Sequence, residues 1–256
     1  MLSQKLIGPL RYFIELSYNG SAYHGWQNQP NALSVQEVTE KALSMLLGAQ
    51  ISIMGAGRTD AGVHAKQMFA HFDTDVDFDA ENLIFKLNSF LPIDVAIHDI
   101  FKVKAEAHTR FDALSRTYVY RVTLKKNVFT NNNVFYLKHA LDVDKMNEAS
   151  NILFEYKDFQ CFSKSKTEVK TYHCDIIKAE WFFKNDELHF VIQANRFLRN
   201  MVRAIVGTMV NIGLGKIDVD HLHTIIQSKN RSEAGFSVPA HGLYLTHIEY
   251  PDNIKI

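Results

Sequence analysis

Hydrophobic and polar side chains recur along the chain with two periods, one typical of strands and the other of helices. Residues 11–18, RYFIELSY, are rich in aromatic and β-branched side chains and predict a strand. Residues 116–124, RTYVYRVTL, alternate more strictly, so that every second residue from Tyr118 to Leu124 shares one face. Further strands are predicted at 51–54, 67–72, 94–103 and 242–250, with a hairpin-like pair at 172–183 and 188–194.

The first predicted helix, residues 34–47, has recognisable start and stop signals. Ser34 and Glu37 form an S-x-x-E capping box, and Gly48 follows as a stop. One face of this helix is predicted to be apolar, with Val35, Val38, Ala42 and Met45 at helical spacing. Four more helices are predicted, near 80–90, 143–156, 196–212 and 218–228.

The predicted helix near 196–212 separates apolar residues from arginines. An apolar stripe is formed by Leu198, Val202, Ile205 and Met209, and the opposite side carries Arg196, Arg199 and Arg203. On spacing alone, a solvated helix face is the preferred explanation of this pattern. A face that lines a cleft and binds phosphates or a carboxylate explains it too. The use of arginine at all three positions favours the cleft mildly, because arginine suits bidentate anion recognition.

The order of the predicted elements indicates an α+β fold. Strands and helices mix without the regular alternation of a doubly wound parallel sheet. We expect two α+β halves that meet near residues 104–112, divided into 1–106 and 107–256. No low-complexity linker marks the junction, so the halves are expected to pack closely.

Composition narrows the class of protein without naming a partner. Hydrophobic residues make up 46% of the 256 residues and charged residues 22%, as in a soluble folded protein. We find no run of eighteen apolar residues and no hydrophobic signal segment, which predicts a cytoplasmic protein. Basic and acidic residues number 28 each, so a polyanion would have to bind local basic patches.

The sequence contains no complete nucleotide-binding or metal-binding motif. GAG at 55–57 lacks the third glycine of a dinucleotide fingerprint, since Asp60 stands there. DTDVD at 73–77 lacks the glycine and glutamate of a calcium loop. The histidines are scattered and no HExxH occurs, so no metal site is predicted. Cys161 and Cys174 are interpreted as ordinary buried thiols, although two cysteines also allow a disulfide.

The segment MGAGRTDAGVHA, residues 54–65, combines glycines with Arg58 and Asp60. A carboxylate in a glycine-flanked turn can simply cap that turn. It can equally be a nucleophile or base that an arginine keeps ionised. The spacing of Arg58, Asp60 and the glycines favours neither role for Asp60. Tyr118 poses a similar choice between a half-buried core tyrosine and one that stacks on a base or accepts a proton.

Within that segment, GRTDAGVHA at 57–65 closely resembles the signature of the tRNA pseudouridine synthase A family. Other segments resemble the family in the same order along the chain: YNGSAYHGWQNQP (18–30) with SVQEVTEKAL (34–43), RTYVYRV (116–122), FLRNMVRAIVGTMVNIGLGK (197–216) and PAHGLYLTHIEY (239–250). The resemblance thus extends from about Arg11 to Tyr250. One departure is Arg196, where the family usually has glycine, and it puts the local backbone in question.

The resemblance implies a pseudouridine synthase fold of two ferredoxin-like halves, with mainly antiparallel sheets that meet at a central cleft. It implies that Asp60 is catalytic, either attacking the ribose C1′ or abstracting a ribose proton to give a glycal. Arg203 would pair with Asp60, and Tyr118 would stack on the uracil and take the C5 proton. The reaction is redox-neutral, so no cofactor or metal is implied.

The resemblance also implies a set of RNA-binding residues. Arg58 would replace the everted base or grip its phosphate, Gly57 would let the backbone approach the nucleotide, and Leu245 would pack against the base. Arg199, Lys164 and Lys166 would hold the tRNA near the cleft. The implied substrate is the anticodon stem-loop of tRNA, at positions 38, 39 and 40, bound by a homodimer in the cytoplasm.

Two other classes of function compete with this one. A non-catalytic RNA-binding protein on the same scaffold would not need Asp60, Tyr118 and Arg203 together. A small-molecule enzyme that uses Asp60 as a general base would bind its substrate with little dependence on salt. RNA binding weakens steeply as salt rises, because it releases counterions.

Overall fold

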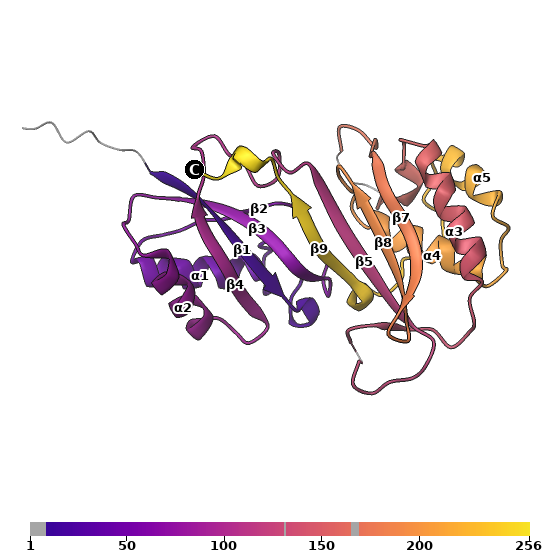
Figure 1. Cartoon of the computed structure of the whole chain (residues 1–256), viewed down its shortest axis with the longest axis horizontal. Coiled ribbons are helices and arrows are strands. Elements are labelled where there is room, and N and C mark those ends of the chain that lie inside the picture. The colour runs from indigo at the N-terminus through magenta and orange to yellow at the C-terminus, as the bar shows by residue number, and fades with distance from the viewer. Residues whose placement is uncertain (1–8, 131, 165–168) are drawn as a thin grey trace, which may run out of the picture. The chain divides into compact units, whose positions relative to one another are not determined.

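The structure is a computed structural model that describes residues 9–130, 132–164 and 169–256. These residues form two compact units (Figure 1). The first comprises the described part of Met1–Leu114 together with Ile248–Ile256, and the second comprises Ser115–His247. The division of the chain therefore falls eight residues after the expected boundary at 106, and the segment Ile248–Ile256 returns to the first unit.

The first unit is an antiparallel sheet with two helices. Its elements in chain order are β1 (Leu10–Tyr18), α1 (Val35–Leu47), β2 (Met54–Gly55), β3 (His64–Thr74), α2 (Ala80–Phe90) and β4 (Val95–Lys102). The strand order is β4-β1-β3, and β2 pairs with the other side of β3. All of these pairs are antiparallel.

Strand β1 is the centre of the first unit's core, because both of its faces are covered. Ile14 and Leu16 are fully buried, and so is Phe13 on the opposite face. There the ring of Tyr250 lies 5.4 Å from Phe13 and 5.2 Å from Phe69, centroid to centroid. The returning segment thus completes this core.

Helix α1 begins and ends as predicted, but its buried face is different. The Ser34 hydroxyl accepts a hydrogen bond from the Glu37 N–H at 3.1 Å, and Gly48 adopts the left-handed conformation with φ 65°. Met45 is 57% exposed, whereas Leu43 is fully buried. Ten residues after Val35, a helix has turned Met45 about 80° away from the buried face.

The second unit repeats the same strand order. Its elements are β5 (Ser115–Thr123), β6 (Phe135–Tyr136), α3 (Val143–Ile152), β7 (Ile176–Lys184), β8 (Glu187–Ala194), α4 (Met201–Gly213), α5 (His221–Ser228) and β9 (Leu243–Glu249). The sheet runs β9-β5-β8-β7, with β5–β8 and β8–β7 antiparallel, and β6 adds a short parallel pairing to β5. The expected α+β class with mainly antiparallel strand pairing is therefore confirmed.

The hairpin between β7 and β8 is explained by its turn residues. Asn185 and Asp186 both have positive φ, 51° and 63°, as a two-residue type I′ turn requires. The predicted hairpin around residues 184–187, KNDE, is confirmed, although its first strand begins at Ile176 and not at residue 172.

Other predicted elements were also too long. Helix α3 gives way to a 3-10 turn at Leu153–Glu155, α5 begins at His221 and not at residue 218, and the strand expected at 51–54 pairs only at Met54–Gly55.

Helix α4 corrects the predicted arginine face. It begins at Met201, so Arg196, Leu198 and Arg199 precede it. Asn200 ends the preceding segment with φ 68°, a left-handed conformation that asparagine tolerates well. Apolar residues on both sides of this break happened to continue one helical period. The helix itself is almost wholly buried, and Arg203 is the one arginine on it.

Both cysteines are buried and free, as expected of ordinary thiols. Burial raises the pKa of Cys161 to about 12 and that of Cys174 to about 11, so neither forms a thiolate readily. Within the part of the chain that the structure describes, no His, Cys, Asp or Glu side chains gather in a group that could hold a metal ion. No helix of that part is long and apolar enough to cross a membrane.

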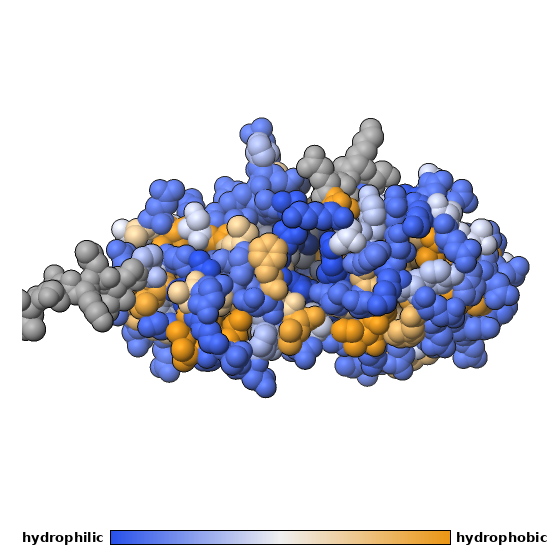
Figure 2. Space-filling model, turned by 90° about the horizontal axis from the view of Figure 1, so that it is seen from above, coloured by the Kyte–Doolittle hydropathy of each residue, from blue (hydrophilic) through white to orange (hydrophobic). Residues whose placement is uncertain are grey.

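The face in Figure 2 is mostly hydrophilic, and hydrophobic side chains appear on it in separate small groups. Large exposed apolar residues occur in both units, among them Phe85, Ile93 and Phe129. Scattered exposed apolar residues are normal on a folded protein. This face therefore presents no single apolar surface that dominates it.

Candidate active site

The loop of residues 56–63 connects β2 to β3 and carries Asp60. The Asp60 carbonyl accepts a hydrogen bond from the Val63 N–H at 3.1 Å, and Gly62 has φ 79°. This geometry is a tight turn that needs glycine at its third position. The Asp60 side chain is half-buried and the Arg58 side chain is exposed. The guanidinium of Arg58 and the carboxylate of Asp60 are thus two residues apart in sequence but differ in their exposure to solvent.

A second segment, residues 18–26, holds this loop in place. The Trp26 N–H donates to the Thr59 carbonyl at 3.4 Å, and the Gly62 N–H donates to the Tyr23 carbonyl at 3.3 Å. The Tyr18 and Thr59 hydroxyls hydrogen-bond at 2.9 Å. Thr59 is therefore fixed through both its backbone and its side chain, directly before Asp60.

Two glycines of the 18–26 segment allow the loop to come this close. A β-carbon on Gly25 would lie 2.3 Å from the Thr59 carbonyl oxygen, and Gly25 also has φ 92°. A β-carbon on Gly20 would lie 2.0 Å from the Val63 carbonyl oxygen. The supporting segment is thus built for backbone-to-backbone contact, and the sequence patterns had offered no sign of that contact.

The glycines of MGAGRTDAGVHA serve different purposes. Gly55 has the Trp26 indole where a side chain would be, 2.4 Å from an added β-carbon, and Gly62 is required by its φ. Gly57, in contrast to Gly55, faces open space, with no atom within 4 Å of an added β-carbon. The backbone at Gly57 is therefore open to the approach of a nucleotide.

Removing the Tyr18 hydroxyl should loosen the Asp60 loop. We expect Tyr18→Phe to lower the free energy of unfolding by about 1 kcal/mol, the scale of one part-buried hydrogen bond. Urea denaturation would measure this change. Tyr12→Phe on the same strand is the control, because the Tyr12 hydroxyl has no hydrogen bond among the described residues. Equal losses in the two variants would contradict a role for the Tyr18–Thr59 contact.

In the second unit, Tyr118 lies on β5 at the edge of the core. Tyr120 and Val122, which share its face, are fully buried, whereas Tyr118 is half-buried. Its ring meets the Phe197 ring edge-on, with centroids 5.2 Å apart at an angle of 89°. Both sequence readings therefore keep support: the tyrosine is packed on one side and accessible on another.

Arg203 on α4 is tied to a loop that precedes β9. Its guanidinium Nε donates to the Val238 carbonyl at 2.7 Å, and the Val238 N–H donates back to the Arg203 carbonyl at 3.2 Å. Burial lowers the pKa of His241, and the positive charge of Arg203 lowers it further. The Tyr120 hydroxyl, whose pKa burial raises, donates to the Pro239 carbonyl. The side chain and the backbone of Arg203 are thus both hydrogen-bonded to this loop.

The expected RNA-binding residues are placed as follows. Lys164 and Arg199 are both exposed and adjacent, since the Lys164 N–H donates to the Arg199 carbonyl at 2.9 Å. Leu245 is buried on β9, with 3% of its surface exposed. Lys166 lies outside the described residues. Arg196 has no positive φ, so arginine in place of the family's glycine requires no unusual backbone there.

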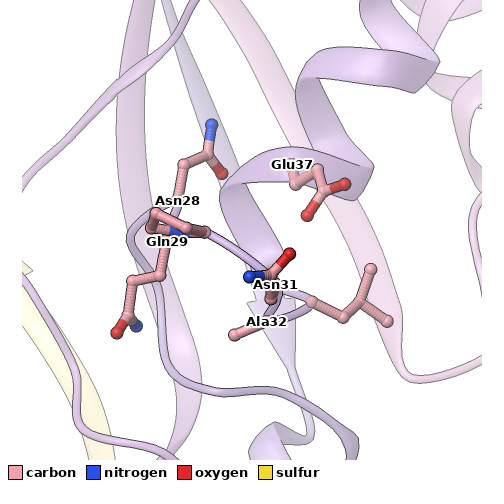
Figure 3. Close-up of a pocket in the computed structure, with 7 residues that line it drawn as sticks. Asn28, Gln29, Asn31, Ala32 and Glu37 are labelled. Carbon is pink, nitrogen blue, oxygen red and sulfur yellow. The ribbon is translucent and has the colours of Figure 1, made fainter.

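A separate concave surface lies beside the start of α1 (Figure 3). It encloses about 560 Å³ and is lined by Asn28, Gln29, Pro30, Asn31, Ala32, Leu33 and Glu37. Its amides are largely engaged within the protein: Asn28 donates to Glu40 and Gln29 donates to the His24 carbonyl. None of the predicted site residues lines it.

Comparison with known proteins identifies the family of the chain. Residues 16–112 and 156–251 match the model of a family described as tRNA pseudouridine synthase. The chain belongs to the tRNA pseudouridine synthase family. The family match includes Asp60 and Arg203, whereas Tyr118 lies in the interval between the two matched ranges.

Members of the family from several bacteria resemble the chain over nearly its whole length. Three examples, each named tRNA pseudouridine synthase A, are as follows. The protein from Parabacteroides distasonis is 50% identical over 245 residues, which is 95% of this chain and 97% of the relative. The one from Azobacteroides pseudotrichonymphae is 51% identical, covering 94% and 97%. The one from Bacteroides fragilis is 49% identical, covering 95% and 98%.

Proposed function

We propose that this protein isomerises uridine to pseudouridine in tRNA, with Asp60 as the catalytic residue. The single observation that carries this proposal is the set of hydrogen bonds that holds the Asp60 loop in a chain of this family. Thr59 is fixed through both its backbone and its side chain, and the neighbouring Asp60 side chain is half-buried. Such support for a neighbouring residue is what a catalytic group needs, because precise placement supplies much of the rate.

The reaction requires no net exchange of atoms. The bond between uracil N1 and ribose C1′ breaks, the base turns, and C5 bonds to C1′, while the C5 proton leaves and N1 gains a proton. Asp60 attacks C1′ or abstracts a ribose proton to give a glycal. Tyr118 is the proposed acceptor of the C5 proton and stacks on the uracil. No cofactor or metal takes part in this scheme.

Arg203 is the proposed partner of Asp60. Its Nε donates to the Val238 carbonyl, and its Nη groups are the proposed donors to the Asp60 carboxylate. A guanidinium beside Asp60 would stabilise its ionised form. A double-mutant cycle on Asp60→Asn and Arg203→Lys tests this pairing, since independent residues would give additive losses.

The remaining residues are proposed to bind the RNA. Arg58 replaces the everted base or grips its phosphate, the open backbone at Gly57 faces the nucleotide, and Leu245 packs against the base. Arg199, Lys164 and Lys166 contact phosphates, which structured RNA presents along with its 2′-hydroxyls. Unstacking the base so that it can be everted costs roughly a few kcal/mol, and these contacts must offset that cost.

The proposed target is the anticodon stem-loop at tRNA positions 38, 39 and 40, and the proposed assembly is a homodimer. We also propose that the two units are ferredoxin-like halves on either side of a cleft. The strand order supports this, since β4-β1-β3-β2 and β9-β5-β8-β7 are the same arrangement. One half carries the Asp60 loop and the other carries Tyr118 and Arg203.

The test is isomerisation by the purified protein. Transcribed tRNA labelled with tritium at C5 of uridine should release the label, because C5 loses its hydrogen when it bonds to C1′. Sequencing after carbodiimide treatment would then locate the modified positions. Salt-dependent tRNA binding without tritium release would favour the non-catalytic RNA-binding protein. The absence of both would favour a small-molecule enzyme.

A further inference from the structure

The loop of residues 231–239 lies between α5 and β9 and has no regular secondary structure. It nevertheless packs against α4 with backbone in direct contact. A β-carbon on Gly207 of α4 would lie 1.7 Å from the Phe236 carbonyl oxygen, and one on Gly235 would lie 2.6 Å from the Thr208 nitrogen. The loop is part-buried, and Val238 in it is fully buried. Carbonyl groups of such a loop that do not face solvent need hydrogen-bond partners, because buried backbone groups are costly to leave unbonded.

The Arg231 side chain supplies those partners. Its Nη1 donates to the carbonyls of Gly235 at 3.0 Å and Ala234 at 3.4 Å, and its Nη2 donates to the Ser237 hydroxyl at 2.8 Å. The guanidinium is part-buried, and no carboxylate among the described residues pairs with it. Arg231 therefore acts as a fork of donors for one loop, a geometry that lysine does not reproduce.

The far end of the same loop holds Arg203. Ser237, which Arg231 binds, also accepts a hydrogen bond from the Asn200 side chain at 2.7 Å, directly before α4. The next residue is Val238, whose carbonyl fixes the Arg203 Nε at 2.7 Å. A continuous set of contacts thus runs from Arg231 through Ser237 and Val238 to the Arg203 guanidinium.

We propose that Arg231 is a positioning residue that orients the Arg203 guanidinium through the 231–239 loop. Its importance for the reaction rests on the proposed function, in which Arg203 pairs with Asp60. Without the Arg231 guanidinium, the carbonyls of residues 234 and 235 lose their hydrogen-bond donor, so the loop becomes less ordered. The Val238 carbonyl is then no longer held in position to accept from the Arg203 Nε. The guanidinium then loses the contact that sets its plane.

Two readouts test this proposal on the full-length protein, with Arg231→Ala and Arg231→Lys. The first is kcat and KM for tRNA, measured well below each variant's melting temperature. Both variants should lower kcat by roughly ten- to a hundredfold, the scale of a small misplacement at a reacting group, while KM stays unchanged. Glu233→Gln, an exposed position on the same loop, is the matched control and should leave kcat as in the wild type.

The second readout does not depend on activity. In protein labelled with 15N-arginine, the Arg203 Nε–H signal is assigned by its loss in Arg203→Lys, and its exchange with solvent is measured. We expect at least about tenfold faster exchange in Arg231→Ala and no change in Glu233→Gln, because a hydrogen-bonded N–H exchanges only after its bond opens.

Unchanged exchange of the Arg203 Nε–H in Arg231→Ala would overturn the proposal, whatever happens to kcat. So would faster exchange accompanied by wild-type kcat in an active enzyme, because orientation by Arg231 would then be irrelevant to the reaction. If the wild type releases no tritium, the proposed function fails, and the exchange experiment still decides whether Arg231 orients Arg203.

Discussion

Replacing Asp60 by alanine is expected to abolish pseudouridine formation and to leave the fold intact. The turn at this position uses the Asp60 carbonyl, which accepts from the Val63 N–H, and alanine keeps that carbonyl. The lost carboxylate is the proposed nucleophile or base, so kcat should fall by about 10⁴-fold or more, as when other enzymes lose such a group. Tritium release from labelled tRNA measures the rate, and circular dichroism checks the fold.

The controls separate catalysis from binding. Asp60→Asn keeps the size of the side chain and should be as inactive as Asp60→Ala, while both retain most of their affinity for tRNA. Asp75→Ala removes an exposed carboxylate from the same unit and should keep wild-type activity. Tritium release near the wild-type rate by the Asp60→Ala protein would refute the proposed mechanism.

The second large effect is expected at Gly25, which lies far from Asp60 in sequence. A β-carbon there would be 2.3 Å from the Thr59 carbonyl, and the φ of 92° disfavours any other residue. Gly25→Ala must therefore push the Asp60 loop away or distort its own backbone. We expect a loss of about 2–5 kcal/mol in the free energy of unfolding and a decrease of about a hundredfold in kcat.

Gly48→Ala is a matched control for this substitution. Gly48 also has a positive φ, 65°, but no atom lies within 4 Å of an added β-carbon. It should lose about 1–2 kcal/mol of stability through backbone strain alone and keep its kcat. Urea denaturation and the tritium assay compare the two variants. If Gly25→Ala retains kcat as Gly48→Ala does, contact with the Thr59 carbonyl does not position Asp60.

Much of the fold was predictable because its signals are local. Alternation located β5, the capping box located the start of α1, and KNDE located the β7–β8 turn. The start of α4 was missed because Leu198 and the helix's own apolar residues fit one period across Asn200. No local signal distinguishes an asparagine that adopts the left-handed conformation from one inside a helix.

The site was predictable only in part, for a different physical reason. Asp60 and Arg203 stood out through resemblance. Spacing alone left the capping and catalytic roles of Asp60 equally acceptable, and it favoured a solvated face for the arginines. The contacts that hold them, Tyr18 with Thr59 and Val238 with Arg203, join residues 41 and 35 positions apart. Such contacts arise when whole helices, strands and loops pack together, and the hydrophobic periodicity along the chain does not predict them.

The return of Ile248–Ile256 to the first unit has a consequence for how the protein is made. Tyr250 packs on Phe13 and Phe69, and its hydroxyl binds the Thr109 carbonyl, so this core lacks a wall until the whole second unit has been translated. Chains generally fold from the N-terminus during synthesis, and unfinished cores expose apolar surface. We therefore expect the core of the nascent first unit to stay incomplete until the segment Ile248–Ile256 has left the ribosome.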